Sequence, residues 1–184
     1  MDSKMIKAVF SLKKNTFITV LVLLLFNRIV AQENSINWLN FEQLEDSLTV
    51  YPKNVFIVFY ADWCAYCKKM DKAAFADAQV IHLLNTDYYA VRMNAETRDS
   101  VVFGGDTYVN KEMGKKRNPT HEIPLLLASR KDHPFSLPAL VILNKKFEVT
   151  ARYFEYLSPK RLKRVLSERP KADKSTTSSA FSSF

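Results

Sequence analysis

Cysteine and histidine are scarce in this sequence, which holds only two cysteines and three histidines among 184 residues. The usual zinc sites need four ligands, commonly supplied as two pairs at short spacing. A second pair is missing here, because His82, His121 and His133 are widely separated. Covalent haem attachment needs a histidine directly after the second cysteine, and Lys68 stands there instead. We therefore predict no metal site and no cofactor.

A strong excess of either charge is also missing. The full chain has 27 Lys and Arg against 19 Asp and Glu, a net charge of +8. Residues 1–31 carry five of the basic side chains and one of the acidic ones, so the rest of the chain keeps 22 against 18. This balance is too mild to indicate binding to nucleic acid. The basic runs at 115–117 and 160–164 are interpreted as solvated surfaces.

Residues 1–31 have the pattern of a secretory signal peptide. A basic stretch precedes an apolar run at 17–26, and Ala31 supplies a small residue before the predicted cleavage point. The run is about half of the ~20 residues that a membrane-spanning helix needs, so a permanent anchor is the weaker alternative. Membrane contact is expected only through this segment if it stays uncleaved. No cysteine lies near the cleavage point, which argues against a lipoprotein.

The two cysteines, Cys64 and Cys67, lie where an apolar, strand-like run meets a helix-like stretch, in VFYADWCAYCKKM (58–70). A thiol in the first turn of a helix faces unpaired N–H groups and the positive end of the helix dipole, and both favour the thiolate that attacks disulfides. The second thiol, one turn further on, can close the ring. A disulfide across so short a loop restricts the unfolded chain little. A redox pair is therefore favoured over a structural disulfide, half a zinc site or two buried thiols.

We predict one domain over residues 32–169 and a polar, disordered tail over 170–184. Asn40 is expected to cap a first helix, with Gln43 completing a capping box. The next part of the pattern predicts a strand at 55–60, a helix from Cys64 that breaks near Asp77, a second helical piece, and a strand at 88–93 parallel to the first. A helix from Pro119 to Ala128 is expected to follow. The chain then ends in an antiparallel hairpin of strands at 138–143 and 147–154 and a last helix capped by Ser158.

This order of elements resembles the thioredoxin fold over about residues 38–168. The specific signature is Trp-Cys-x-x-Cys-Lys after a hydrophobic strand, supported by a proline that opens the third strand. Within that superfamily, FYADWC (59–64) and FADAQV (75–80) are most similar to exported thioredoxin-like proteins and to the C-terminal periplasmic domain of the reductase DsbD. The resemblance implies an α/β fold with a central mixed sheet flanked by helices, and an insertion before the cis-proline strand.

The resemblance also implies roles for particular residues. Cys64 matches the nucleophile and Cys67 the resolving thiol, while Trp63 matches the tryptophan beside the active site. Pro138 matches the cis-proline that faces the disulfide, and Leu137 the residue whose backbone pairs with a bound substrate. Tyr66, between the cysteines, either adds a ring beside the thiols or packs on a partner; both interpretations stay open.

Three positions depart from the pattern or are harder to interpret. Thioredoxin has a buried aspartate six residues before its first cysteine, and here that position is Val58. Arg92 falls where thioredoxin has the lysine that pairs with this aspartate, so we expect Arg92 to be a strand-end charge and Asp62 or water to serve Cys67. The pair His121-Glu122 is interpreted as a surface position on a helix.

The sequence thus predicts an exported, for instance periplasmic, thiol–disulfide oxidoreductase that reduces or exchanges disulfides through its Cys-Ala-Tyr-Cys pair. Its expected partners are disulfide-containing exported proteins, with a membrane thiol reductase as a candidate electron donor. The alternative is a peptide-binding or chaperone-like module of the same fold without significant redox turnover. Loss of the acid at Val58 gives this alternative some weight.

Overall fold

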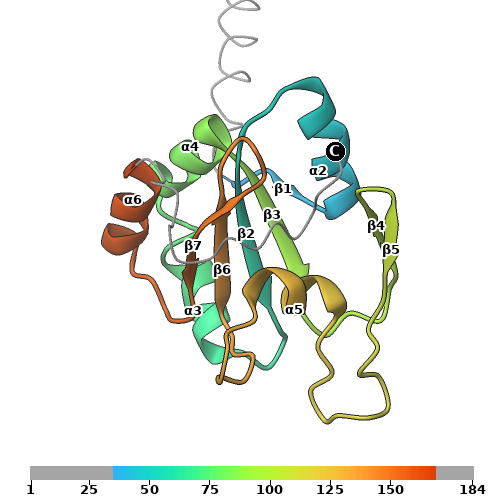
Figure 1. Ribbon diagram of the computed structural model, residues 1–184. Helices are drawn as coiled ribbons and strands as arrows, with labels where there is room; N and C mark the ends of the chain where they lie inside the picture. The colour runs from blue at the N-terminus through green and yellow to red at the C-terminus, as the bar shows by residue number, and fades with distance from the viewer. Residues whose placement is uncertain (1–34, 169–184) are drawn as a thin grey trace, which may run out of the picture. The chain divides into compact units, whose positions relative to one another are not determined.

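The computed structural model describes residues 35–168; the predicted signal peptide (1–31) and tail (170–184) lie outside the described residues. A five-stranded mixed sheet forms the centre of the fold, with strand order β1-β3-β2-β6-β7 (Figure 1). Helices cover both faces of this sheet. The predicted fold class, a thioredoxin-like α/β fold, is confirmed.

The elements follow one another in a βα pattern interrupted by a small hairpin. In chain order they are β1 (Trp38–Leu39), α2 (Phe41–Val50), β2 (Asn54–Tyr60), α3 (Ala65–Lys72), α4 (Ala78–Asp87), β3 (Tyr88–Asn94), β4 (Val101–Phe103), β5 (Asp106–Tyr108), α5 (Glu122–Ala128), β6 (Ala139–Leu143), β7 (Val149–Tyr153) and α6 (Pro159–Ser167). The sequence pattern did not predict β1 or the β4–β5 hairpin. The other strands agree with the prediction to within two residues at each end.

Strand β2 lies at the centre of the sheet, which explains its unbroken run of apolar residues. It pairs with β3 in parallel, as predicted, and with β6 in antiparallel orientation. In this register Tyr60 lies beside Asn94, and Phe59 lies beside Ala139. The carboxyl ends of β2 and β3 and the amino end of β6 therefore meet at one edge of the sheet, and both cysteines follow directly from it.

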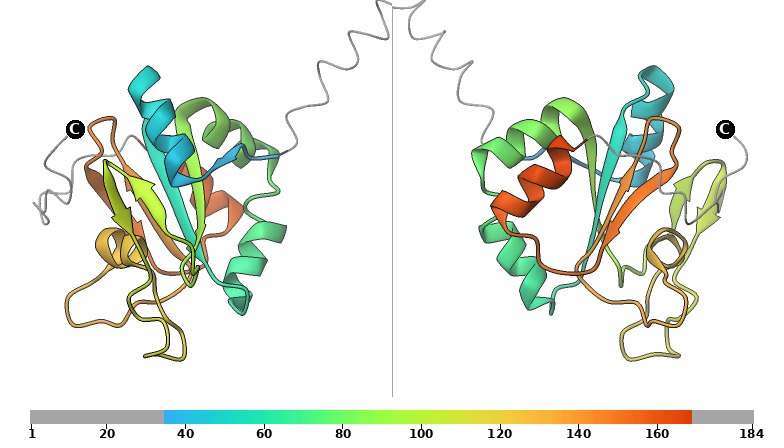
Figure 2. Two further views of the ribbon diagram at one scale, coloured as in Figure 1. Left: turned by 90° about the vertical axis from the view of Figure 1, so that its right-hand side faces the viewer. Right: turned by 60° about the vertical axis from the view of Figure 1, so that its left-hand side comes forward.

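The two faces of β2 enter two separate apolar cores, because side chains alternate across a strand. Phe56 and Val58 pack with apolar residues of α3, α4 and α6. Val55, Ile57 and Phe59 pack on the other side with residues of α2, α5 and β4. Figure 2 shows these two groups of elements on opposite sides of the sheet. The sheet is thus held from both sides.

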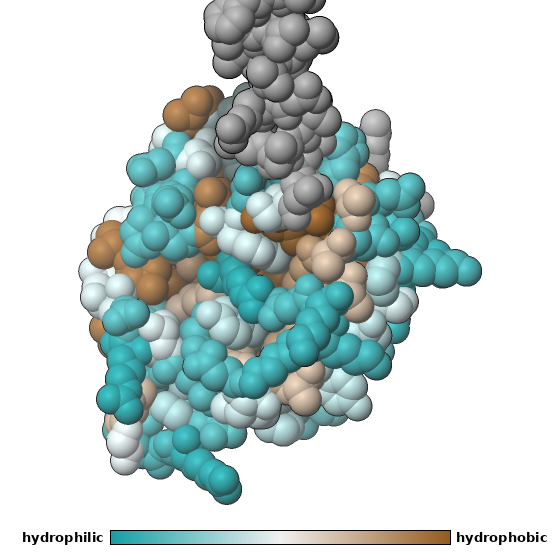
Figure 3. All heavy atoms as spheres, turned by 180° about the vertical axis from the view of Figure 1, so that it is seen from behind, coloured by the Kyte–Doolittle hydropathy of each residue, from teal (hydrophilic) through white to brown (hydrophobic). Residues whose placement is uncertain are grey.

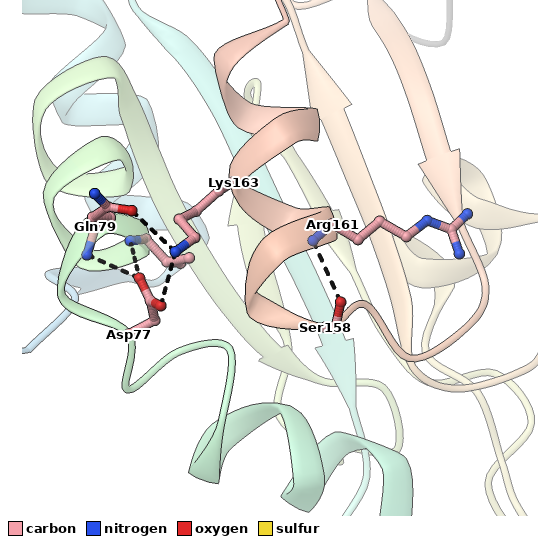
Figure 4. Close-up of polar contacts among 6 residues, drawn as sticks. Asp77, Gln79, Ser158, Arg161 and Lys163 are labelled. Carbon is pink, nitrogen blue, oxygen red and sulfur yellow. Dashed lines mark hydrogen bonds and ion pairs between the residues drawn. The ribbon is translucent and has the colours of Figure 1, made fainter.

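Polar side chains fix the ends of the helices. The predicted capping box of α2 is present, with Gln43 N–H donating to Asn40 and Asn40 N–H donating to the Gln43 side chain. The predicted cap of α6 is confirmed by a bond from Arg161 N–H to Ser158 Oγ (3.4 Å). Asp77 caps α4 and also accepts from Lys163 Nζ of α6 at 3.2 Å (Figure 4). This last contact fastens α4 to α6.

The predicted helix start at Pro119 is wrong, because α5 begins at Glu122 with His121 as its N-cap. The preceding residues are held as a loop by their own hydrogen bonds: Asn110 Nδ2 donates to Pro119 O (3.0 Å), and His121 N–H donates to Ala95 O (2.8 Å). Within residues 35–168 every helix is too short or too polar to span a bilayer.

Candidate active site

Cys64 and Cys67 are joined by a disulfide at the start of α3. Cys64 is the N-cap of this helix, and its sulfur accepts a hydrogen bond from the Cys67 N–H at 3.1 Å. An N–H aimed at sulfur favours negative charge there once the disulfide opens, as does the helix dipole. The two residues are only 3% and 4% exposed, so exposure does not distinguish them. The N-cap position singles out Cys64 as the thiol better placed to become a thiolate.

Two aromatic side chains flank the disulfide and reach into solvent. Trp63 is 58% exposed and Tyr66 is 60% exposed, whereas most large apolar side chains of the described residues are buried. The indole Nε1–H of Trp63 donates to Glu96 Oε1 at 3.0 Å, which fixes the direction of its ring. Sequence reasoning missed Glu96, because the contact joins positions 33 residues apart. Tyr66 is a surface aromatic, and its role in contacting a partner stays a prediction.

Leu137 and Pro138 lie at the same edge of the sheet as the cysteines. Pro138 directly precedes Ala139, which pairs with Phe59, and the Leu137–Pro138 peptide bond is cis, as the resemblance implied. Pro138 is buried and Leu137 is partly exposed. The sheet therefore brings both predicted substrate-binding residues to the edge from which the chain runs to Cys64.

The expectation that Arg92 is merely a strand-end charge is wrong. Its guanidinium makes two hydrogen bonds to Asp71, at 2.7 and 2.8 Å, and stacks over the Tyr60 ring with a centroid distance of 4.4 Å. Burial alone would lower the pKa of Arg92, but the hydrogen bonds and charge of Asp71 outweigh burial and raise it. Arg92 is therefore firmly charged and ties β3 to α3.

This ion pair lies beside Val58, the position at which the resemblance to thioredoxin leads us to expect an acid. Val58 lies directly beside Arg92 in the β2–β3 register, so the carboxylate that pairs with the cation comes from α3 instead of β2. Asp71 lies one helical turn beyond Cys67 on the same helix. The spacing of four residues between Cys67 and Asp71 is visible in the sequence, but only the fold shows that Arg92 contacts Asp71. Asp62, the side chain that we expected to serve Cys67, is exposed.

The surface interpretation of His121 is also wrong. Its side chain is fully buried, and its Nδ1 accepts the Ile123 N–H at 3.2 Å to cap α5. Glu122 is half-buried and pairs with Lys111 while accepting the Val109 N–H at 2.8 Å. His121 and Glu122 therefore anchor the segment before the cis-proline strand, residues 95–133, which we call the inserted segment.

We expect the stability of the fold to fall when His121 is protonated. Burial lowers the pKa of His121 below its usual value of 6.5, while backbone carbonyls of Tyr108 and Asp99 and the Glu122 charge oppose this shift only partly. The unfolded chain then binds the proton more readily, so stability is full above pH 6.5 and is lost as the pH falls below it.

Urea denaturation of the wild type and of His121→Asn between about pH 8 and pH 5.5 measures this effect. Asparagine keeps an acceptor for the cap but does not titrate, so the fall in midpoint should shrink in this variant. The control is His82→Asn at an exposed position on α4, which should behave like the wild type. An equal fall in His121→Asn and the wild type would contradict the assignment.

Other described features lie away from the cysteines. A cavity of about 1080 Å³ is lined by residues at the opposite edge of the sheet, among them Asn54, Tyr88 and Asn144. Among residues 35–168 no cluster of three or more His, Cys, Asp or Glu side chains is placed to hold a metal ion.

The fold and the cysteine pair together define a protein of the thioredoxin class with a disulfide at the start of α3. Residues 47–169 match the family model of the thioredoxin-like domain. The chain belongs to this thioredoxin-like family.

Individual relatives carry names from disulfide chemistry. The thiol:disulfide interchange protein DsbD of Pseudoalteromonas atlantica is 34% identical over 65 residues, and that of Campylobacter jejuni is 26% identical over 104 residues. These alignments cover 35% and 50% of this chain, but only 11% and 18% of the two relatives.

Solved structures include a putative disulphide-isomerase from Bacteroides thetaiotaomicron (22% identity, 73% of this chain and 93% of that one, TM-score 0.48). Another is the oxidised C-terminal domain of DsbD from Neisseria meningitidis (17% identity, 71% and 91%, TM-score 0.46).

Proposed function

We propose that this chain is an exported thiol–disulfide oxidoreductase that reduces or exchanges disulfides in other exported proteins. The observation that carries the proposal is the position of Cys64, whose sulfur caps α3 and accepts the Cys67 N–H at 3.1 Å. Membership in the thioredoxin-like family and the interchange-protein names of its relatives support the same chemistry. The signal-peptide pattern supports export.

The reaction moves two electrons between two pairs of sulfurs. In the reduced chain, the Cys64 thiolate attacks one sulfur of a client disulfide, forming a mixed disulfide and releasing the other client sulfur as a thiolate, which takes up a proton. Cys67 then loses its proton and attacks the Cys64 sulfur. The client leaves with two thiols, and the chain is left with the Cys64–Cys67 disulfide seen in the structure. Run backwards, the same steps oxidise a client.

The surrounding residues have separate parts in this proposal. Trp63 and Tyr66 offer exposed apolar area for a client, while Leu137 and Pro138 lie at the sheet edge where a client backbone would run. The pair of Arg92 and Asp71 holds the helix that carries both thiols. A membrane thiol reductase is the proposed electron donor, because an exported cysteine pair otherwise persists as a disulfide.

Trapping a reaction intermediate tests the proposal. In Cys67→Ser the mixed disulfide between Cys64 and a client cannot be resolved internally, so we expect it to accumulate on incubation with an oxidised model protein such as insulin. Non-reducing gel electrophoresis followed by mass spectrometry measures the adduct. It should form in most of the Cys67→Ser chains and in very few wild-type chains.

The peptide-binding alternative predicts a different result. A chaperone-like module would hold insulin through Trp63 and Tyr66 without a covalent bond, so Cys67→Ser would give complexes that separate in denaturant. The exposed aromatics are the observation that favours this alternative. Absence of any adduct bonded to Cys64 would overturn the exchange proposal.

A further inference from the structure

The loop that precedes α5 is held in a fixed shape by its own polar side chains. We call residues 110–120 the basic loop. Asn110 Nδ2 donates to Thr97 O (3.1 Å) and to Pro119 O (3.0 Å), which brings the two ends of the loop together. Glu112 accepts the Thr120 N–H at 3.0 Å. Compact surface loops whose ends meet in this way are frequently functional.

The basic side chains at the tip of the loop differ in whether they form an ion pair. Lys116 is bound to the Glu112 carboxylate, which also holds the loop closed. Lys115 and Arg117 are exposed and make no ion pair within the described residues 35–168, although the charge of Lys115 helps to lower the pKa of Glu112. The loop therefore presents two cations to solvent on a preformed scaffold.

A chain of contacts links the foot of this loop to Trp63, the neighbour of Cys64. Its foot is bonded to Thr97, and the preceding residue, Glu96, accepts the indole N–H of Trp63, the neighbour of Cys64. Figure 1 shows the loop at the end of the sheet where β2 leads into α3. Seen from behind, the lower left of the molecule, where this loop lies after the half turn, is hydrophilic (Figure 3).

We propose that the basic loop binds an acidic segment of a client protein and so guides its disulfide to Cys64. The inference rests on the proposed function and adds the charge of the client to it. Charges at the rim of an interface act mainly on the rate of association, and their effect decreases with salt. A fixed loop favours this use, because little backbone ordering remains to oppose binding.

The test compares two peptides that differ only around one disulfide, which is flanked by glutamates in one peptide and by glutamines in the other. The full chain should reduce the acidic peptide with a kcat/KM roughly tenfold higher at low salt, and the preference should fall towards one at about 0.5 M salt. In Lys115→Gln/Arg117→Gln the preference should fall to about twofold or less at low salt, with the glutamine peptide unaffected.

A matched control removes the same two residue types elsewhere. Lys160 and Arg164 are exposed on α6, which packs on the opposite face of the sheet from α5 (Figure 2). Lys160→Gln/Arg164→Gln should keep the full preference. A loop variant that keeps the preference, or a control that loses as much, would overturn the proposal.

Direct binding separates this proposal from the exchange chemistry. Fluorescence anisotropy of a labelled acidic peptide without cysteines measures binding to the oxidised chain, and the loop variant should weaken it several-fold. If this binding is seen but neither disulfide peptide is reduced, the loop binds acidic segments as proposed, but the exchange proposal fails and with it the guiding of a disulfide to Cys64. Binding of the loop to anionic vesicles with no preference between the peptides would instead indicate a membrane surface and overturn the client proposal.

Discussion

Replacing Cys64 by serine is expected to lower the rate of disulfide exchange by at least about a thousandfold, because the attacking thiolate is removed. A serine hydroxyl at the same N-cap keeps the hydrogen bond from the Cys67 N–H, since serine is a favourable N-cap residue. The fold should therefore persist. The stability lost with the disulfide should be small, because it joins residues only three positions apart in the sequence.

Insulin reduction by dithiothreitol, followed as turbidity, measures this effect. Cys67→Ser is the matched control, because it removes a sulfur and the same disulfide but keeps the proposed nucleophile. It should still form the mixed disulfide, whereas Cys64→Ser should form none. Turnover that survives in Cys64→Ser would eliminate the assignment of this residue as the nucleophile.

Local signals explain why so much of this site was predictable. The thiols are contiguous in sequence with the hydrophobic strand before them and the helix after them. Residues 55–72 are therefore enough to predict how these parts are arranged. The caps at Asn40 and Ser158 are equally local, and both are confirmed. The cis bond before Pro138 came from the family resemblance, since composition does not determine it.

Residues that depend on tertiary contacts were interpreted wrongly. We interpreted His121 as a helix-surface residue because histidine is polar, but the packing of the inserted segment buries it. We interpreted Arg92 as a strand-end charge because its partner, Asp71, lies on a different element and the sequence does not show that the two meet. The strands of the β4–β5 hairpin are three residues long, too short for an alternating pattern to emerge.

The inserted segment is joined to the rest of the fold by contacts that join distant parts of the sequence. Its hairpin is joined to α2 by bonds from Val102 N–H to Glu42 and from Gly104 N–H to Glu45, and Phe103 packs on Phe41 with a centroid distance of 5.3 Å. These contacts hold the segment on one face of the sheet. The basic loop then extends from a fixed base at the end of the sheet where β2 leads into α3, which is consistent with a role in choosing clients.

Replacing Phe56 by alanine is expected to lower the free energy of unfolding by about 3–5 kcal/mol, which is a large part of the stability of a domain of this size. Phe56 is fully buried on the central strand, and its ring packs edge-on against Phe75 with a centroid distance of 6.3 Å. Removing the ring opens a cavity between the sheet and the helices on that face. Neighbours on a rigid sheet can close such a cavity only in part.

Urea denaturation checks the value, with Phe56→Leu as the control that fills more of the space and should lose roughly 1–2 kcal/mol. A loss below about 1 kcal/mol in Phe56→Ala would show that this core is less tightly packed than its burial indicates. Phe56 precedes Cys64 by eight residues and touches neither thiol in the proposed reaction. At a temperature where Phe56→Ala is still folded, its rate of insulin reduction should therefore equal that of the wild type, whereas Cys64→Ser should be stable but inactive. These opposite results would separate the residues that hold the sheet edge in place from the sulfur that reacts there.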